Sequence, residues 1–112
     1  MASYRIDKIN EQVREVLTDI LRTVKDPRVS KAFVSVTSAD VSKDLSIAKI
    51  YYGVMGANDK DVADGLRSAS GYIRSELASR INLRLTPKLI FIKDDSAEKA
   101  VRISEILKDI EK

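Results

Sequence analysis

The feature that most constrains this chain is an apolar stripe at helical spacing that runs through a weak point. Val62, Leu66, Ala69, Ile73 and Leu77 recur at three- and four-residue steps, which predicts helix from residue 58 or 59 to about residue 82. The stripe crosses the sequence Ala-Ser-Gly at residues 69–71, where glycine costs about 1 kcal/mol relative to alanine. Either one helix carries a costly glycine, or two helices meet there, and the serines in this region favour a kink.

A kink at this point would place exposed backbone among cations. A helix that begins at Ser70 and Gly71 offers free amide N–H groups and a favourable dipole to a phosphate, and the arginine fork suits phosphate oxygens. We therefore interpret Ser70 and Gly71 as the point of backbone approach to a nucleic acid. The phosphate partners predicted with them are Arg67, Arg74, Arg80, Arg84 and Lys88. Two alternatives stay open: Gly71 could serve only close helix packing, and a lysine at a strand end could serve only solubility.

The charge of the chain is concentrated around the same stretch. Residues 65–93 contain six Lys or Arg and one acid, whereas the formal net charge of all 112 residues is only +3. A basic segment of this kind is typical of a surface that faces nucleic acid. The competing interpretation is that these side chains point in different directions and only solvate a helix and a strand.

The residues before this stretch change from a helical to a strand pattern. The apolar spacing predicts an amphipathic helix over residues 4–25, with Ser3 as a reasonable N-cap and Asp26-Pro27 as the stop. Alternating residues predict strands at 33–41 and 45–55, and the turn-forming residues 42–44 join them as an antiparallel hairpin. The cap of the following helix is Asn58 or Asp59.

The residues after it give one more strand and one more helix. The run 88–93 is apolar between two lysines, which predicts a strand that is buried on both faces or lies centrally in the sheet. Asp95 and Glu98 have capping-box spacing, and the last amphipathic helix follows to the C-terminus. We interpret the pair Asp94-Asp95 as part of this cap, because a hydrolytic metal centre needs carboxylates that converge from separate elements.

The composition excludes most catalytic chemistry. There is no cysteine and no histidine, which removes thiol nucleophiles, disulfides and the commonest metal ligand and neutral-pH base. We expect no catalytic residue, no metal, no cofactor and no small-molecule substrate. The length suits one domain over residues 1–112, and without a membrane-spanning or signal-peptide pattern we expect a cytoplasmic monomer.

The order of these elements predicts an α+β fold. Helix, strand, strand, broken helix pair, strand and helix place the helices on one face of a three-stranded sheet. The same order is the connectivity of the type II K-homology fold, which binds single-stranded nucleic acid at a glycine loop between its two middle helices.

Four stretches together resemble the ribosome-binding factor A family. They are Asp-Pro-Arg at 26–28, Asp-Leu-Ser-Ile-Ala-Lys-Ile-Tyr at 44–51, Ala-Ser-Gly-Tyr-Ile-Arg at 69–74, and Arg-Leu-Thr-Pro-Lys-Leu-Ile-Phe-Ile-Lys-Asp-Asp-Ser at 84–96. Each alone is weak, but in this order they span nearly the whole chain. The resemblance implies a type II K-homology-like assembly factor that binds the small (30S) ribosomal subunit and its 16S rRNA. It also implies support of late maturation, including processing of the precursor's 5′ end, and a role in cold adaptation.

The family differs from ordinary K-homology domains in a way that this sequence shares. In place of Gly-x-x-Gly the chain has only Ala-Ser-Gly at 69–71. We therefore expect a kinked helix whose surface docks on structured RNA, rather than a loop that clamps a free strand. The alternative function is a protein-interaction module that docks another assembly factor through an exposed face of the first or last helix.

Overall fold

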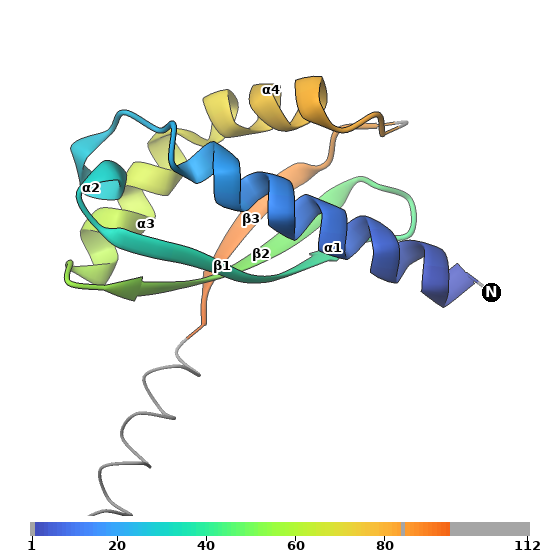
Figure 1. Cartoon of the computed structure of the whole chain (residues 1–112), viewed down its shortest axis with the longest axis horizontal. Helices are drawn as coiled ribbons and strands as arrows, with labels where there is room; N and C mark the ends of the chain where they lie inside the picture. The colour runs from blue at the N-terminus through green and yellow to red at the C-terminus, as the bar shows by residue number, and fades with distance from the viewer. Residues whose placement is uncertain (1, 84, 95–112) are drawn as a thin grey trace, which may run out of the picture.

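A computed structural model describes residues 2–83 and 85–94 of the chain. Its elements follow the predicted order, with one additional short helix (Figure 1). They are α1 (Ala2–Leu21), α2 (Pro27–Ser30), β1 (Phe33–Val41), β2 (Ile47–Met55), α3 (Asp59–Ser68), α4 (Ser70–Arg80) and β3 (Lys88–Lys93). The predicted last helix, with its capping box at Asp95 and Glu98, lies outside the described residues.

Helix α1 forms because its apolar stripe packs on the sheet, where Val13, Leu17 and Ile20 are fully buried. The prediction of its two ends was wrong. The helix begins at Ala2, so Ser3 lies inside it, and it ends at Leu21 rather than near residue 25.

The sequence Asp26-Pro27 starts a helix instead of stopping one. The carboxylate of Asp26 accepts a hydrogen bond from the backbone N–H of Arg28 and caps α2. Pro27 occupies the first helical position, where its missing N–H is not needed and its fixed φ suits the helix. The residues between α1 and α2 are therefore a connection between two helices.

The sheet has the order β1-β2-β3, with an antiparallel β1–β2 hairpin and a parallel β2–β3 pair. The predicted hairpin is confirmed, but β2 begins at Ile47 rather than at Leu45. Leu45 has a φ of 63°, a left-handed conformation that a strand does not accommodate. Asp44 holds this turn, because its Oδ1 accepts hydrogen bonds from the hydroxyl groups of Ser42 and Ser46 and from the Ser46 N–H.

The prediction for β3 was wrong in its position. β3 lies at the edge of the sheet, and each of its side chains is at least partly exposed. Its apolar run is continuous because Leu89 and Phe91 pack on the core while Ile90 and Ile92 lie on the opposite face. The ring of Phe91 meets Tyr52 of β2 edge-on, with centroids 6.3 Å apart.

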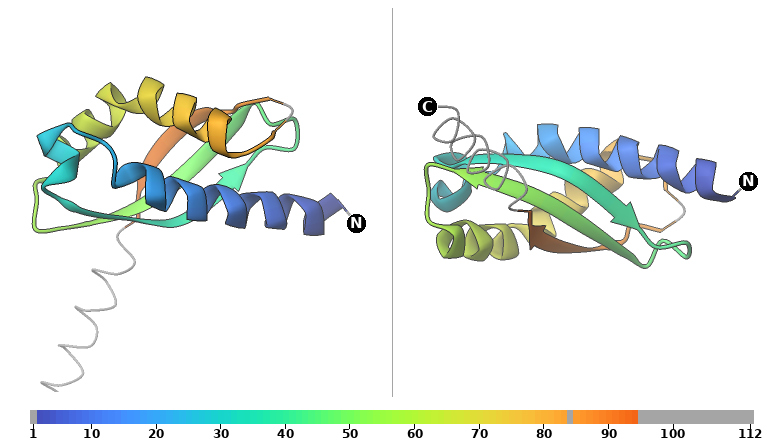
Figure 2. Two further views of the ribbon diagram at one scale, coloured as in Figure 1. Left: turned by 45° about the horizontal axis from the view of Figure 1, so that its top comes forward. Right: turned by 90° about the horizontal axis from the view of Figure 1, so that it is seen from below.

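The core lies between one face of the sheet and the helices that cover it (Figure 2). The buried residues of β2 are every second residue, as predicted: Ala48, Ile50, Tyr52 and Val54. The stripe of the broken helix pair meets them from the helical side with Val62, Leu66, Ile73 and Leu77. The order and layering are those of a type II K-homology-like α+β domain, so that prediction is confirmed for the described residues.

Candidate nucleic-acid interface

The broken helix is a joint at Ala69. This residue is both the C-cap of α3 and the N-cap of α4, with φ −88° and ψ 0°. Its N–H donates to the carbonyl of Gly65 and its own carbonyl accepts from the N–H of Ile73, both at 2.9 Å. In the described part of the chain, no side chain caps the start of α4. Because Ala69 is itself in a right-handed helical conformation, α4 begins at Ser70 and Gly71 directly from the last turn of α3.

Gly71 is exposed and is not used for close packing. A Cβ placed on it would meet no atom within 4 Å among the described residues. The packing alternative for this glycine is therefore wrong. The open space instead lets a large group approach the backbone at the start of α4.

The glycine that does allow close packing is Gly65, one turn before the joint. A Cβ placed there would lie 2.9 Å from Cγ2 of Val29 and 3.0 Å from Cβ of Arg28, so α2 rests directly on the backbone of α3. The local sequence does not show which of the two glycines is packed, since both lie on the same predicted helix and only the folded chain brings α2 to Gly65.

A hollow of about 380 Å³ lies beside the joint. It is formed where the end of α1 and the connection after it approach the end of α3. Its lining is Thr23, Val24, Lys25, Asp26, Ser68, Ala69 and Tyr72. Tyr72 is 44% exposed, and its hydroxyl lies 2.6 Å from Oγ1 of Thr23. Local sequence gives no sign that residues 23–26 come to the kink, because this contact is made only in the folded chain.

The side chain of Arg28, beside this hollow, is held by hydrogen bonds to other side chains. Its guanidinium makes a two-point ion pair with Asp26, at 3.0 and 2.7 Å, and Nη2 also donates to Oγ of Ser68 at 3.2 Å. The hydrogen bonds from Arg28 lower the pKa of the Asp26 carboxyl below its ordinary value. The guanidinium of Arg28 is therefore paired with Asp26.

Some of the predicted arginines are paired with other groups of the protein. Arg67 projects from the last turn of α3 with its side chain 81% exposed, and its nearest acid is Asp64 at 3.7 Å. Arg74 is exposed, but its Nη2 donates to the carbonyl of Thr86 at 2.7 Å. Arg80 pairs with Glu76 at 3.3 Å. On a regular helix Arg80 lies about 120° around the axis from Arg74, so the two do not share one face.

The remaining predicted cations lie near the start of β3. The bond from Arg74 to Thr86 brings that arginine close to Lys88, which is exposed. Arg84 lies outside the described residues. Lys93 at the other end of β3 pairs with Asp59 at 2.6 Å. The structure therefore groups Arg67, Ser70 and Gly71 at the joint, and Arg74 with Lys88 further along α4.

The acidic residues of the described ranges do not form a metal centre. No group of three or more potential ligands gathers anywhere within 2–83 and 85–94. Asp94 accepts a hydrogen bond from Oγ1 of Thr37 at 2.9 Å, and its neighbour Asp95 lies outside the described part. None of the helices described is long and apolar enough to cross a membrane.

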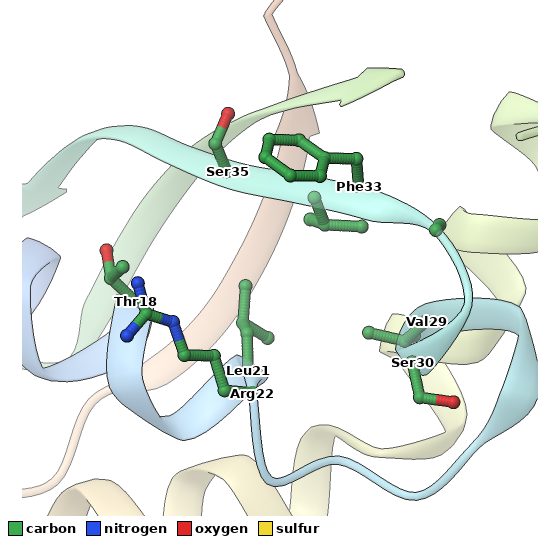
Figure 3. A pocket seen from close by; sticks show the side chains of 9 residues that line it. Thr18, Leu21, Arg22, Val29, Ser30, Phe33 and Ser35 are labelled. Atoms are coloured by element: carbon green, nitrogen blue, oxygen red, sulfur yellow. The ribbon is translucent and has the colours of Figure 1, made fainter. Parts of the chain in front are cut away.

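A second hollow of about 380 Å³ lies on another part of the surface, between α1, α2 and the start of β1. Figure 3 shows Thr18 and Arg22 of α1 on one side of it and Phe33 and Ser35 of β1 on the other. Phe33 is 73% exposed. No residue of the predicted interface lines this hollow, and sequence reasoning did not identify it.

Comparison with known proteins gives one consistent family. A family model described as Ribosome-binding factor A matches residues 5–107. The protein named Ribosome-binding factor A of Caldanaerobacter subterraneus is 44% identical over 112 residues, which cover 97% of this chain and 91% of that protein. The protein of the same name from Clostridium tetani is 44% identical, with 98% and 93% covered.

Solved structures of this name share the fold. The crystal structure of ribosome-binding factor A from Thermus thermophilus superposes with a TM-score of 0.72 at 23% identity, covering 79% of this chain and 94% of that one. A solution structure from Thermotoga maritima, described as a putative ribosome binding factor A, gives 0.72 at 28% identity, with 82% and 89% covered. A Thermus thermophilus homology model fitted into a cryo-electron microscopy map of a 30S complex gives 0.65 at 24% identity, with 77% and 91% covered.

Proposed function

The chain belongs to the ribosome-binding factor A family, and on that premise we propose that it binds the small ribosomal subunit and its 16S rRNA through the joint between α3 and α4. In this role it is a non-catalytic assembly factor that acts late in subunit maturation. The choice of partner is supported by the Thermus thermophilus relative, whose homology model was fitted into a map of its complex with the 30S subunit.

The observation that carries the proposal is the open backbone at Gly71. The uncovered backbone at the start of α4 and the 81% exposed side chain of Arg67 lie on either side of Ala69. A helix N-terminus and a guanidinium are both suited to phosphate oxygens, and contacts to phosphate carry no sequence preference of their own. This arrangement favours docking on the backbone of folded RNA.

A charge reversal with a matched control tests the proposal. Arg67→Glu removes a cation whose nearest acid, Asp64, is three residues earlier at 3.7 Å. Arg22→Glu makes the same change in a pair of the same spacing, with Asp19 at 3.9 Å, just after the end of α1. We expect Arg67→Glu to weaken co-sedimentation with 30S subunits, with a smaller salt dependence. Arg22 lines the hollow beside Phe33, so Arg22→Glu should bind like the wild type if the joint is the interface and should weaken binding only if that hollow is used.

Equal binding of the folded Arg67→Glu protein and the wild type across a range of salt concentrations would contradict the proposal. Circular dichroism of both variants checks that the fold is kept. Crosslinking of the bound protein to subunit RNA, mapped to nucleotide and residue, then tests residues 67–88 directly.

The finer activities implied by the family are part of the same proposal. They are support of 5′-end processing of precursor 16S rRNA, importance for growth in the cold, a cytoplasmic location and action as a monomer. Cells that lack the protein should then accumulate precursor 16S rRNA, most strongly at low temperature. A variant that fails to bind 30S subunits should not correct this defect.

A second candidate function is docking of a protein partner at the hollow beside Phe33. It is favoured by the exposure of this ring and by the apolar residues Leu21, Val29 and Val34 around it. Nuclease digestion of the subunit RNA separates the two functions. Binding that survives digestion and is lost in Phe33→Ser would favour the protein partner.

A further inference from the structure

The end of the domain opposite the joint carries a further hollow. There α1 begins, α4 ends and the turn between β1 and β2 lies beside them (Figure 1 and Figure 2). The hollow between these elements has a volume of about 470 Å³, and we call it the far groove. Its lining residues, none of which lines the hollow beside the joint, are Arg5, Ile6, Ile9, Lys43, Leu45, Asn82 and Leu83.

The floor of the far groove is apolar and is held in place by the core. Ile9, Leu45 and Leu83 come from three separate parts of the chain, and each packs against the core while it stays partly exposed. The N–H of Val41 donates to Oδ1 of Asn10 at 2.8 Å, which joins α1 to the strand that leads into the turn. The turn itself is held by the hydrogen bonds to Asp44. The backbone around the groove is therefore in place before a partner binds.

The rim of the far groove is positive. Arg5 of α1 and Lys43 of the turn are exposed, and neither makes an ion pair with another residue of the described ranges. No acidic residue is among the described residues that line the groove. On a regular helix Asp7 lies about 160° around the axis from Arg5, and the carboxylate of Asp44 is occupied by the serines of its own turn. The groove thus presents two cations above an apolar floor.

This combination suits a strand of RNA whose bases are unpaired. Phosphate oxygens are the ligands that arginine and lysine side chains bind in nucleic acids. An unstacked base needs an apolar surface to cover its ring and a polar group for its edge. The amide of Asn82, which is exposed at the groove, both donates and accepts hydrogen bonds.

The far groove and the joint lie at the two ends of the same pair of helices. Helices α1 and α4 pack against each other and run in opposite directions (Figure 1). The contact of Thr23 with Tyr72 marks the joint end, and Arg5 lies near the other end of α1. From residue 5 to residue 21 the helix rises about 24 Å. Two contacts this far apart on one rigid domain would fix its orientation, and each would strengthen the other.

We propose that the far groove is a second RNA-binding site. Arg5 and Lys43 bind phosphates of an unpaired strand of the subunit RNA, and the apolar floor receives one of its bases. The inference rests on the proposed function for its partner, but it does not require that the joint is the first contact.

Photocrosslinking on 30S subunits tests which molecule enters the far groove. The sequence has no cysteine, so Asn82→Cys introduces a single attachment site for a thiol-directed aryl azide. We expect irradiation of the bound, labelled protein to join residue 82 to 16S rRNA. The same label on Lys60→Cys is the control, since Lys60 is exposed but lines neither the groove nor the hollow beside the joint, and it should give a much weaker crosslink.

The salt dependence of 30S binding tests the two cations. Arg5→Gln combined with Lys43→Gln should lower the slope of log K against log salt concentration by about 2, one for each lost phosphate contact. Lys31→Gln combined with Lys60→Gln removes the same charge from two exposed lysines that make no ion pair within the described ranges. This control should change the slope much less. Circular dichroism checks that both double variants keep the fold.

Three results would overturn the proposal. They are a crosslink from residue 82 to a ribosomal protein instead of RNA, no crosslink from residue 82 while the wild type binds, and an equal change of slope in the two double variants. The same label on Ser70→Cys reports on the joint separately. An RNA crosslink from residue 82 with none from residue 70 would support the far groove and contradict the joint, and the reverse pattern would contradict the far groove alone.

Discussion

The hydroxyl group of Tyr72 lies 2.6 Å from that of Thr23, although 49 residues separate them in the sequence. The pair connects the first turn of α4 to the turn that ends α1, and Thr23 in turn donates to the carbonyl of Ile20 in one arrangement of its hydroxyl. The direction in which α4 leaves the joint is therefore fixed from outside the broken helix. A joint held in this way keeps one fixed backbone surface, which the proposed contact with RNA requires.

This contact predicts a measurable coupling between Thr23 and Tyr72. Tyr72→Phe and Thr23→Val should each lower the free energy of unfolding by about 0.5–1 kcal/mol, since the bond is exposed and a typical net hydrogen bond has this strength. Because both changes remove the same bond, the double variant should lose less than the sum of the two. Urea unfolding of the four proteins measures the cycle. Strict additivity would show that the two hydroxyl groups do not interact.

The two glycines of the broken helix should respond in opposite directions to alanine. Gly65→Ala pushes a methyl group into Val29 and Arg28, and overpacking of this kind costs about 1–3 kcal/mol. Gly71→Ala meets only open space and gains up to about 1 kcal/mol of helix propensity. Thermal unfolding should therefore give a lower midpoint for the first variant and an equal or higher one for the second. The reverse order would contradict the close contact of α2 with α3.

Gly71→Ala also separates stability from function. A methyl group at residue 71 fills the space through which a phosphate would approach the start of α4. The variant should fold as well as the wild type and bind 30S subunits more weakly in co-sedimentation. If its binding equals that of the wild type, the RNA does not approach the backbone at this position.

The turn at Asp44 predicts a pH dependence at acidic pH. Hydrogen bonds from Ser46 and Ser42 lower the pKa of the Asp44 carboxyl to about 2, whereas an unfolded aspartate has a pKa of about 3.9. A lowered pKa in the folded state adds stability that is fully present above about pH 4 and is lost as the pH falls through about 2. The stability advantage of the wild type over Asp44→Asn should shrink across that interval. Carbon-13 NMR of the carboxyl group gives the pKa directly, and a value near that of an unfolded aspartate would contradict the turn.

Sequence reasoning predicted the elements that depend on local pattern. The alternation of Ala48 and Ile50 with Ile47 and Lys49 indicated both faces of β2, and the serines around Gly71 indicated the position of the kink. It failed where a distant contact decides. β3 has the same continuous apolar run whether it is central or at an edge, and only the pairing with β2 settles its place.

Only part of the candidate site could be predicted from the sequence, because distant contacts decide the rest. Local sequence identified the exposed start of α4 and the projecting Arg67. It could not show that the carbonyl of Thr86 takes one donor of Arg74, or that Arg28 joins Asp26 to Ser68, because these partners are set by tertiary packing. Residues 65–93 therefore carry less unpaired positive charge than their sequence indicates.

Arg74 can both hold Thr86 and contact a phosphate, and measurements of stability and of salt dependence separate these two roles. One of the five N–H donors of its guanidinium holds Thr86, which leaves others for a phosphate. Arg74→Gln should lower the free energy of unfolding by about 1 kcal/mol and lower the salt slope of 30S binding by about 1. Arg80→Gln is the matched control, since Glu76 already pairs with that arginine and its salt slope should stay unchanged. If Arg74→Gln destabilises the domain but keeps the full salt slope, Arg74 only holds the connection before β3 in place.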